Sequence, residues 1–208
     1  MKAVLCDEKL FWLLNKNGKQ KLQSAGSKVL TWQNLICSTC NNKTTQPYDK
    51  AWETLSSQLQ ESLFGLKPPT IRQANSVFPY DTERNMTYVQ LYLAKLTGCN
   101  LKSVGIAVDL ESLAKSIRNR AVSSNIFFVK FGYFSDGFTG ISDLLITTCN
   151  RTDRLAFATW FYAVNGTAVN VMYAVDGESR LDLADWWHPK YCTNKLIIHA
   201  FDRCQASA

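Results

Sequence analysis

The chain has 208 residues, of which 46% are hydrophobic and 19% are charged, so it is long enough and apolar enough to fold around its own core. This composition excludes a disordered protein, and no apolar run is long enough to predict a membrane-spanning helix. The formal net charge of +6 permits binding to nucleic acid or to an acidic protein surface without requiring either.

The N-terminal part of the chain carries helix signals followed by a basic stretch. Asp7 is a suitable N-cap for a short helix over residues 8–16, and Gly18 follows the expected end of that helix. We expect the next stretch to be a solvated loop, which could contact phosphate groups through its lysines. These lysines are Lys16, Lys19, Lys21 and Lys28. The apolar segment 29–37 fits a strand and a helix equally well.

Two longer helices are predicted in the first half of the chain. In residues 48–64 the apolar side chains recur at spacings of three and four, between Pro47 and Gly65. These side chains are Tyr48, Trp52, Leu55, Leu59 and Leu63. A second helix is expected over residues 83–97, and Gly98 is expected to end it.

Residues 102–134 have the outline of a strand, a helix and a second strand. The strands are expected at 102–109 and 125–134, and Asp109 is placed to cap the helix between them. Two strands joined by a helix are usually parallel neighbours, so the pattern predicts a βαβ crossover.

A hairpin is predicted over residues 154–175. Two strand-like segments flank Asn165-Gly166, which suits a two-residue type I′ turn. With Val164 opposite Thr167, both faces of the hairpin are largely apolar, so we expect a central hairpin covered on both sides by helices. A last strand is expected at 196–201. The sequence therefore predicts one α+β domain over residues 1–208. Its sheet should be mostly antiparallel with about five strands, covered by three to four helices, with a helix-rich part at 1–123 and a sheet-rich part at 124–208.

Cysteines and one histidine suggest a metal site. Cys37 and Cys40 form a C-x2-C pair, and His188 and Cys192 form an H-x3-C pair, which together could supply four ligands to zinc. The pairs are far apart in sequence, and buried thiols or disulfides are the alternative. Redox chemistry at the C-x2-C pair is disfavoured because loop residues follow it.

The two histidines, His188 and His199, suggest general acid and base catalysis in phosphodiester hydrolysis, with Lys190 or Lys195 stabilising the transition state. The alternative is that His199 is a hydrogen-bonded histidine within the sheet and that His188 is a surface turn residue. Asp109 and Asp136 could hold Mg²⁺ at strand ends, although a helix cap and a turn former explain them as well. No glycine-rich phosphate-binding motif is present.

Aromatic residues interleave with basic ones in residues 127–134 and 186–191. Such patterns stack single-stranded bases and bind phosphates, although core packing produces them too. The expected contact residues are the four lysines of the basic stretch together with Trp186, Trp187, Lys190 and Tyr191.

Compartment and modification signals conflict. Seven cysteines cannot all pair internally, and the acidic residues near the N-terminus do not fit a secretory signal peptide, which favours an intracellular protein. Four glycosylation motifs, at Asn42, Asn85, Asn150 and Asn165, keep a secreted disulfide-linked glycoprotein that binds a receptor or small ligand as an alternative. The leading hypothesis is a non-enzymatic binding protein for single-stranded nucleic acid or an acidic protein surface, with no cofactor other than the hypothetical zinc. The nuclease is the second hypothesis.

Overall fold

The computed structural model describes ten segments of the chain. They are residues 11–15, 18–22, 39–63, 69–105, 110–122, 126–149, 154–175, 177–179, 181–192 and 194–201. Its helices are η3 (Cys40–Thr44), α1 (Gln46–Leu63), α2 (Ala74–Val77), α3 (Thr82–Ser103), α4 (Glu111–Asn119) and η4 (Leu181–Leu183). None of the helices within these segments is both long and apolar enough to cross a membrane.

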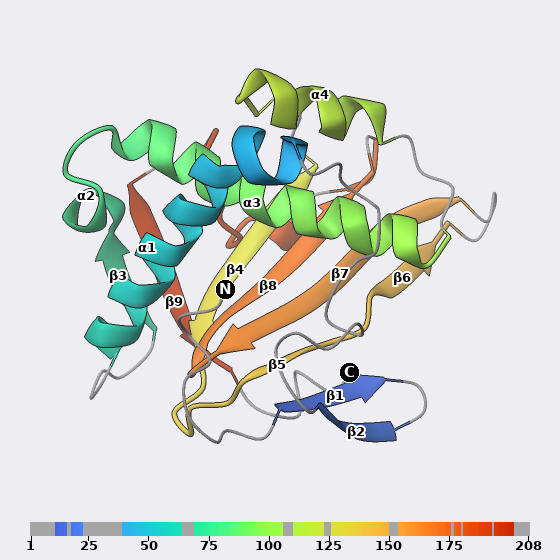
Figure 1. Cartoon of the computed structure of the whole chain (residues 1–208), viewed down its shortest axis with the longest axis horizontal. Helices are drawn as coiled ribbons and strands as arrows, with labels where there is room; N and C mark the ends of the chain where they lie inside the picture. The colour runs from blue at the N-terminus through green and yellow to red at the C-terminus, as the bar shows by residue number, and fades with distance from the viewer. Residues whose placement is uncertain are drawn as a thin grey trace.

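The centre of the fold is a mostly antiparallel sheet of seven strands (Figure 1). The strands are β3 (Thr70–Gln73), β4 (Phe127–Tyr133), β5 (Gly140–Ile141), β6 (Leu145–Thr148), β7 (Leu155–Val164), β8 (Thr167–Ala174) and β9 (Lys195–Ala200). Their order is β3-β9-β4-β8-β7-β5, and β6 also pairs with β7. Every pair is antiparallel except β4 with β9. The predicted α+β class is confirmed, with two more strands than expected.

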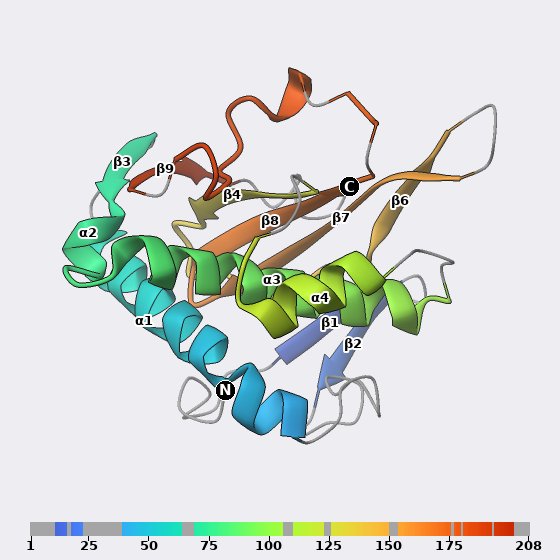
Figure 2. The same cartoon turned by 90° about the horizontal axis from the view of Figure 1, so that it is seen from above.

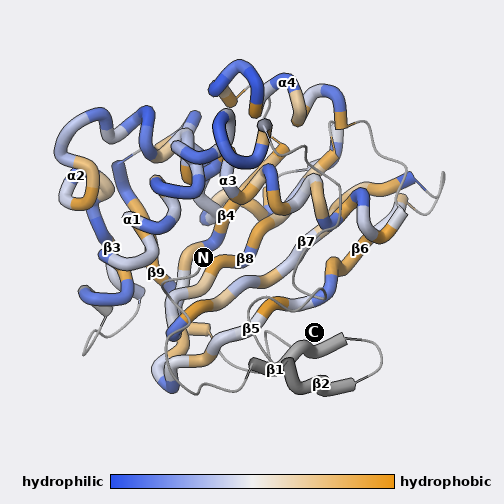
Figure 3. Tube along the Cα trace, in the orientation of Figure 1, coloured by the Kyte–Doolittle hydropathy of each residue, from blue (hydrophilic) through white to orange (hydrophobic). Residues whose placement is uncertain are grey.

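The hairpin of β7 and β8 forms as its sequence predicts. Val164 pairs with Thr167, and the turn residues Asn165 and Gly166 have φ values of 49° and 85°, as a type I′ turn requires. Trp160 lies opposite Val171, and both are buried. Figure 3 shows long hydrophobic stretches along β4, β8 and β7, which are the central strands.

The helices α1, α3 and α4 pack on one face of the sheet (Figure 2). Helix α1 confirms the predicted helix as far as Leu63, after which the next residues lie outside the described segments, and it buries the apolar side chains of one face, among them Trp52, Leu55 and Leu59. Helix α3 is buried on nearly all sides, so its polar side chains need partners. Thr97 accepts a hydrogen bond from the Trp160 indole at 2.8 Å, and Lys95 forms an ion pair with Asp49 of α1.

The expectation that helices cover both faces is wrong. In Figure 2 the helices lie on one side of the sheet, and the segment 181–192, which includes η4, lies on the other. This segment packs Leu183 and Trp186 against Phe128 and its neighbours on β7 and β8. An irregular segment leaves more of a sheet face open than a layer of helices does, and this opening positions the candidate site.

Gly98 does not end α3, which continues to Ser103. A Cβ atom at Gly98 would lie 2.8 Å from Cδ2 of Leu113 in α4, so this glycine serves the close approach of two helices and not a helix end. Lys102 and Ser103 are consequently helical, and the strand expected at 102–109 does not form over its described residues. The parallel neighbour of β4 is β9, which contradicts the predicted βαβ crossover. Asp109 lies outside the described residues.

The prediction of a helix over residues 8–16 is also wrong for residues 11–15, which the structure describes. Residues 11–15 form strand β1 (Phe11–Asn15), which pairs with β2 (Gly18–Leu22) in a hairpin. Four consecutive apolar residues, 11–14, have no helical period, so pairing with a second strand satisfies the backbone equally well. Lys19 and Lys21 therefore lie in a strand and not in a loop. Lys16, Lys28 and segment 29–37 lie outside the described residues.

Candidate functional site

The strands β4 and β9 separate from each other to form a fork. They pair only from Phe131 with Ile198 to Tyr133 with Ala200, so β4 does not pair with the start of β9, whose other edge pairs with β3. The gap beside β4 is filled by Trp187, whose backbone N–H donates to the Val129 carbonyl at 2.7 Å and whose backbone carbonyl accepts the Val129 N–H at 2.9 Å. A pocket lies beside these two hydrogen bonds between Val129 and Trp187, and we call it the fork pocket. Its volume is about 390 Å³.

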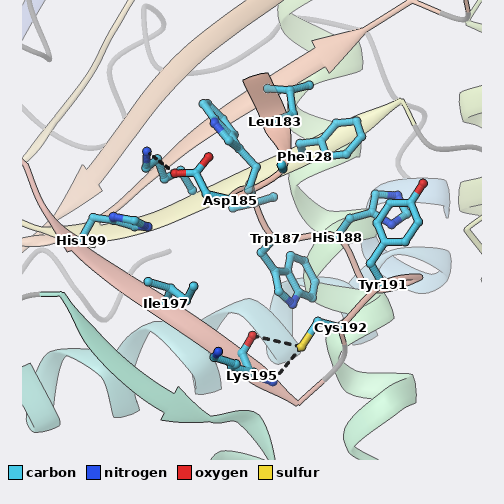
Figure 4. A pocket seen from close by; sticks show the side chains of 14 residues that line it. Phe128, Leu183, Asp185, Trp187, His188, Tyr191, Cys192, Lys195, Ile197 and His199 are labelled. Atoms are coloured by element: carbon cyan, nitrogen blue, oxygen red, sulfur yellow. Dashed lines mark hydrogen bonds and ion pairs between the residues drawn. The ribbon is translucent and has the colours of Figure 1, made fainter. Parts of the chain in front are cut away.

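The walls of the fork pocket come from three stretches of chain (Figure 4). Strand β4 contributes Phe128, Val129 and Lys130; segment 183–192 contributes Leu183, Ala184, Asp185, Trp186, Trp187, His188, Tyr191 and Cys192; and β9 contributes Lys195, Ile197 and His199. On β9 the side chains of Lys195, Ile197 and His199 alternate with Leu196 and Ile198, which are fully buried in the core. The pocket therefore opens on the sheet face that the helices leave uncovered.

The pair of adjacent tryptophans divides between the two faces of the sheet. Trp187 is only 6% exposed and packs edge-on against Phe131 in the main core, with ring centroids 5.4 Å apart. Trp186 is half-buried on the other face of the sheet, in the cluster that contains Phe128 and Phe157. Lys130 Nζ lies 5.9 Å from the centroid of the Trp186 ring. Trp186 thus presents part of its indole to the fork pocket.

His188 is a buried core histidine. Its side chain is 1% exposed, and its ring lies between Phe128 and Tyr191, at centroid distances of 5.4 and 5.2 Å. The backbone N–H of Lys190 donates to His188 Nδ1 at 3.1 Å. Because Nδ1 accepts this bond, the neutral ring carries its proton on Nε2. This geometry positions the loop 188–192, and it corrects the alternative of a surface turn residue.

His199 lies at a different side of the fork pocket from His188. Figure 4 shows His199 near Asp185, with His188 and Tyr191 across the pocket. Lys130 Nζ forms an ion pair with Asp185 at 2.9 Å. Burial and the Lys130 charge lower the pKa of His199, and the Asp185 carboxylate partly opposes them. The hydrogen bond from Lys130 lowers the pKa of Asp185, so this carboxylate stays ionised.

The structure does not assemble the hypothetical zinc site from its described residues. Within these segments no three side chains of His, Cys, Asp or Glu gather as metal ligands, so Cys40 does not join His188 and Cys192. The Cys192 thiol instead accepts the N–H of Lys195 at 3.3 Å, which closes the turn before β9. Cys37 lies outside the described residues.

Comparison of the chain with family models, with curated proteins and with solved structures found no match.

The remaining predicted contact residues do not surround one site. Trp186, Tyr191 and Lys195 line the fork pocket, and Lys190 is exposed in the neighbouring turn. Lys19 and Lys21 belong to the β1–β2 hairpin, which lies near β5 (Figure 1). Strand β5 is at one edge of the sheet, and β9 lies near the opposite edge. Asp136 accepts the N–H of Phe138 at 3.1 Å in a turn, which supports its role as a turn former.

Sequence reasoning missed the pairing of Lys130 with Asp185 and its position beside His199. Side chains alternate between the two faces along a strand, so the spacing of Phe128 and Lys130 indicates that they share one face of β4, and this was the available signal. The position of β9 beside β4 was not predictable from local patterns, because the two strands are more than sixty residues apart in sequence.

Proposed function

We propose that the chain is a non-enzymatic binding protein for single-stranded nucleic acid, and that one nucleobase of the strand enters the fork pocket. The observation that supports this most is the combination of aromatic and cationic side chains around an opening of about 390 Å³. Volumes of this order hold small organic ligands. Trp186 and the 63% exposed Tyr191 offer ring faces on which a base can stack.

Cations for the phosphate backbone lie beside these aromatic rings. Lys195 is exposed at the rim of the fork pocket, and Lys190 is exposed one residue before Tyr191. Lys130 lies within the pocket, although its charge is balanced by Asp185. The net charge of +6 adds a weak long-range attraction for a polyanion. A strand could therefore stack a base and neutralise adjacent phosphates at the same place.

Fluorescence anisotropy with a short labelled single-stranded RNA tests the proposal. Base stacking contributes about 1–3 kcal/mol per base, so Trp186→Ala or Tyr191→Ala should weaken binding by roughly fivefold or more. Replacing Lys190 and Lys195 by methionine should reduce the slope of log affinity against log salt by about 0.7 for each phosphate that the variant no longer neutralises. Tyr80, which is 84% exposed and precedes α3, provides the matched control, and Tyr80→Ala should bind RNA like the wild type.

Two results would contradict the proposal. One is the absence of RNA binding at low salt, and the other is an equal loss in the Tyr80→Ala control and in the pocket variants. Polyglutamate should be measured in parallel. If it binds as tightly as RNA and its affinity is unaffected by Trp186→Ala, the partner is an acidic protein surface and not a nucleic acid.

Phosphodiester hydrolysis is the second candidate, because His188 and His199 line the same pocket. The burial of His188 and the use of its Nδ1 as an acceptor make it a poor proton shuttle. Incubation of the protein with labelled RNA separates the two functions. Cleavage that disappears in His199→Gln would favour the hydrolase, and intact RNA bound at the pocket favours the binding protein.

A further inference from the structure

The electrostatics of the fork pocket depend on which of its cations is available to a ligand. Lys130 is only 27% exposed and donates to Asp185 at 2.9 Å, so its charge is already balanced inside the pocket. Lys195 is exposed at the rim and is strongly hydrated there. Among the described lining residues, no uncompensated positive charge therefore lies in the inner part of the pocket while His199 is neutral.

Two histidines line the pocket, and His199 is the one that can change this balance near neutral pH, because His188 is buried and its Nδ1 already accepts a hydrogen bond. The His199 side chain lines the pocket on the face of β9 that the helices leave uncovered, and its partner on β4 is Gly132, which the Phe201 ring covers. Among the described residues, the charged groups that face His199 are Lys130 of β4 and Asp185 of the covering segment, and Lys195 lies further along its own strand. Burial and Lys130 keep the pKa of His199 below its ordinary value, so the free protein holds this imidazole mostly neutral at neutral pH.

We infer that His199 is the phosphate-binding residue of the fork pocket and takes up a proton when a strand of nucleic acid binds. This inference rests on the proposed function. A phosphate group beside the imidazole favours the charged ring and offsets the repulsion from Lys130. The proton comes from solvent, and the resulting N–H donates to a phosphate oxygen. Binding is thereby coupled to pH through one identifiable side chain.

Calorimetric titration of the protein with a short single-stranded RNA tests the inference. Measurements at pH 6.5 in buffers of different ionisation enthalpy give the number of protons taken up, and we expect a fraction of one proton per bound strand. Affinity should increase as the pH falls from about 8 to 6, up to roughly tenfold per pH unit for one proton. His199→Gln should bind more weakly at pH 6, take up no proton and show no pH dependence. His199→Arg carries a permanent charge, so it should bind tightly at both pH values without proton uptake.

The controls separate this inference from the proposed function. An oligonucleotide with neutral methylphosphonate linkages should cause no proton uptake, because it offers no charge to the imidazole. Lys195→Met should weaken binding and leave the proton count unchanged. If the wild type binds RNA without proton uptake, or if His199→Gln keeps the same uptake, the inference is wrong while the proposed function stands. If no variant binds RNA, both are wrong.

Discussion

Gly132 on β4 is the position at which the structure predicts a clear effect of one added methyl group. An alanine Cβ atom there would lie 2.3 Å from Cε2 and 2.6 Å from Cδ2 of the Phe201 ring. The ring cannot move away freely, because it packs against Phe161 and Phe134 at centroid distances of 5.4 and 6.1 Å. Overpacking of this kind costs about 1–3 kcal/mol, so Gly132→Ala should lower the free energy of unfolding by about that amount.

The sign of this effect should reverse when the ring is absent. In the Phe201→Ala background the new methyl group has space, and Gly132→Ala should raise the free energy of unfolding by about 0.4–1 kcal/mol by restricting the unfolded chain. Urea unfolding followed by tryptophan fluorescence measures all four members of this double-mutant cycle. Gly105 provides the control, since its φ of 73° makes Gly105→Ala unfavourable although no atom lies within 4 Å of the added Cβ. Its cost should be equal in both backgrounds. An equal cost of Gly132→Ala in both backgrounds would refute the steric argument.

Three further predictions concern the pocket, the core and the hairpin. Lys130→Met removes the partner that lowers the pKa of Asp185. This half-exposed ion pair should contribute about 0.2–1 kcal/mol to the free energy of unfolding above pH ~4. The contribution should be lost as the pH falls through the lowered pKa of Asp185. Urea midpoints of wild type and variant should therefore converge in acid, and a constant difference down to pH 2 would contradict the assignment. Burial raises the pKa of the Cys99 thiol to about 11. Iodoacetamide at pH 8 should therefore label Cys99 only after the protein unfolds. Rapid labelling of the native protein would show that this thiol is accessible. Gly166→Ala forces a side chain into a φ of 85° and places its Cβ atom 2.8 Å from the Phe134 carbonyl oxygen. This substitution should destabilise the protein by more than about 1 kcal/mol, measured by thermal unfolding. An unchanged midpoint would argue against the turn geometry.

Local patterns predicted the elements whose signals lie within a few residues of one another. The hairpin around Asn165 and Gly166 combines period-two alternation with residues that accept positive φ, so register and turn follow from the sequence alone. The helix α1 likewise repeats its apolar residues at helical spacing between clear start and end signals. In both cases one structure satisfies the local backbone and buries the apolar face. From this the sequence by itself determined the α+β class and the central position of the hairpin.

Only the tertiary structure decided the parts that depend on distant neighbours. Gly98 has the sequence appearance of a helix end, but its close approach to Leu113 explains why the helix continues. The site also depends on distant neighbours. Alternation within a strand indicates which face Lys130 or His199 lies on, but it does not show that β4 and β9 are adjacent in the sheet. The fork between β4 and β9 brought these residues together and enclosed His188. Pairing between segments far apart in sequence is set by the burial of the whole core, and no local pattern encodes it.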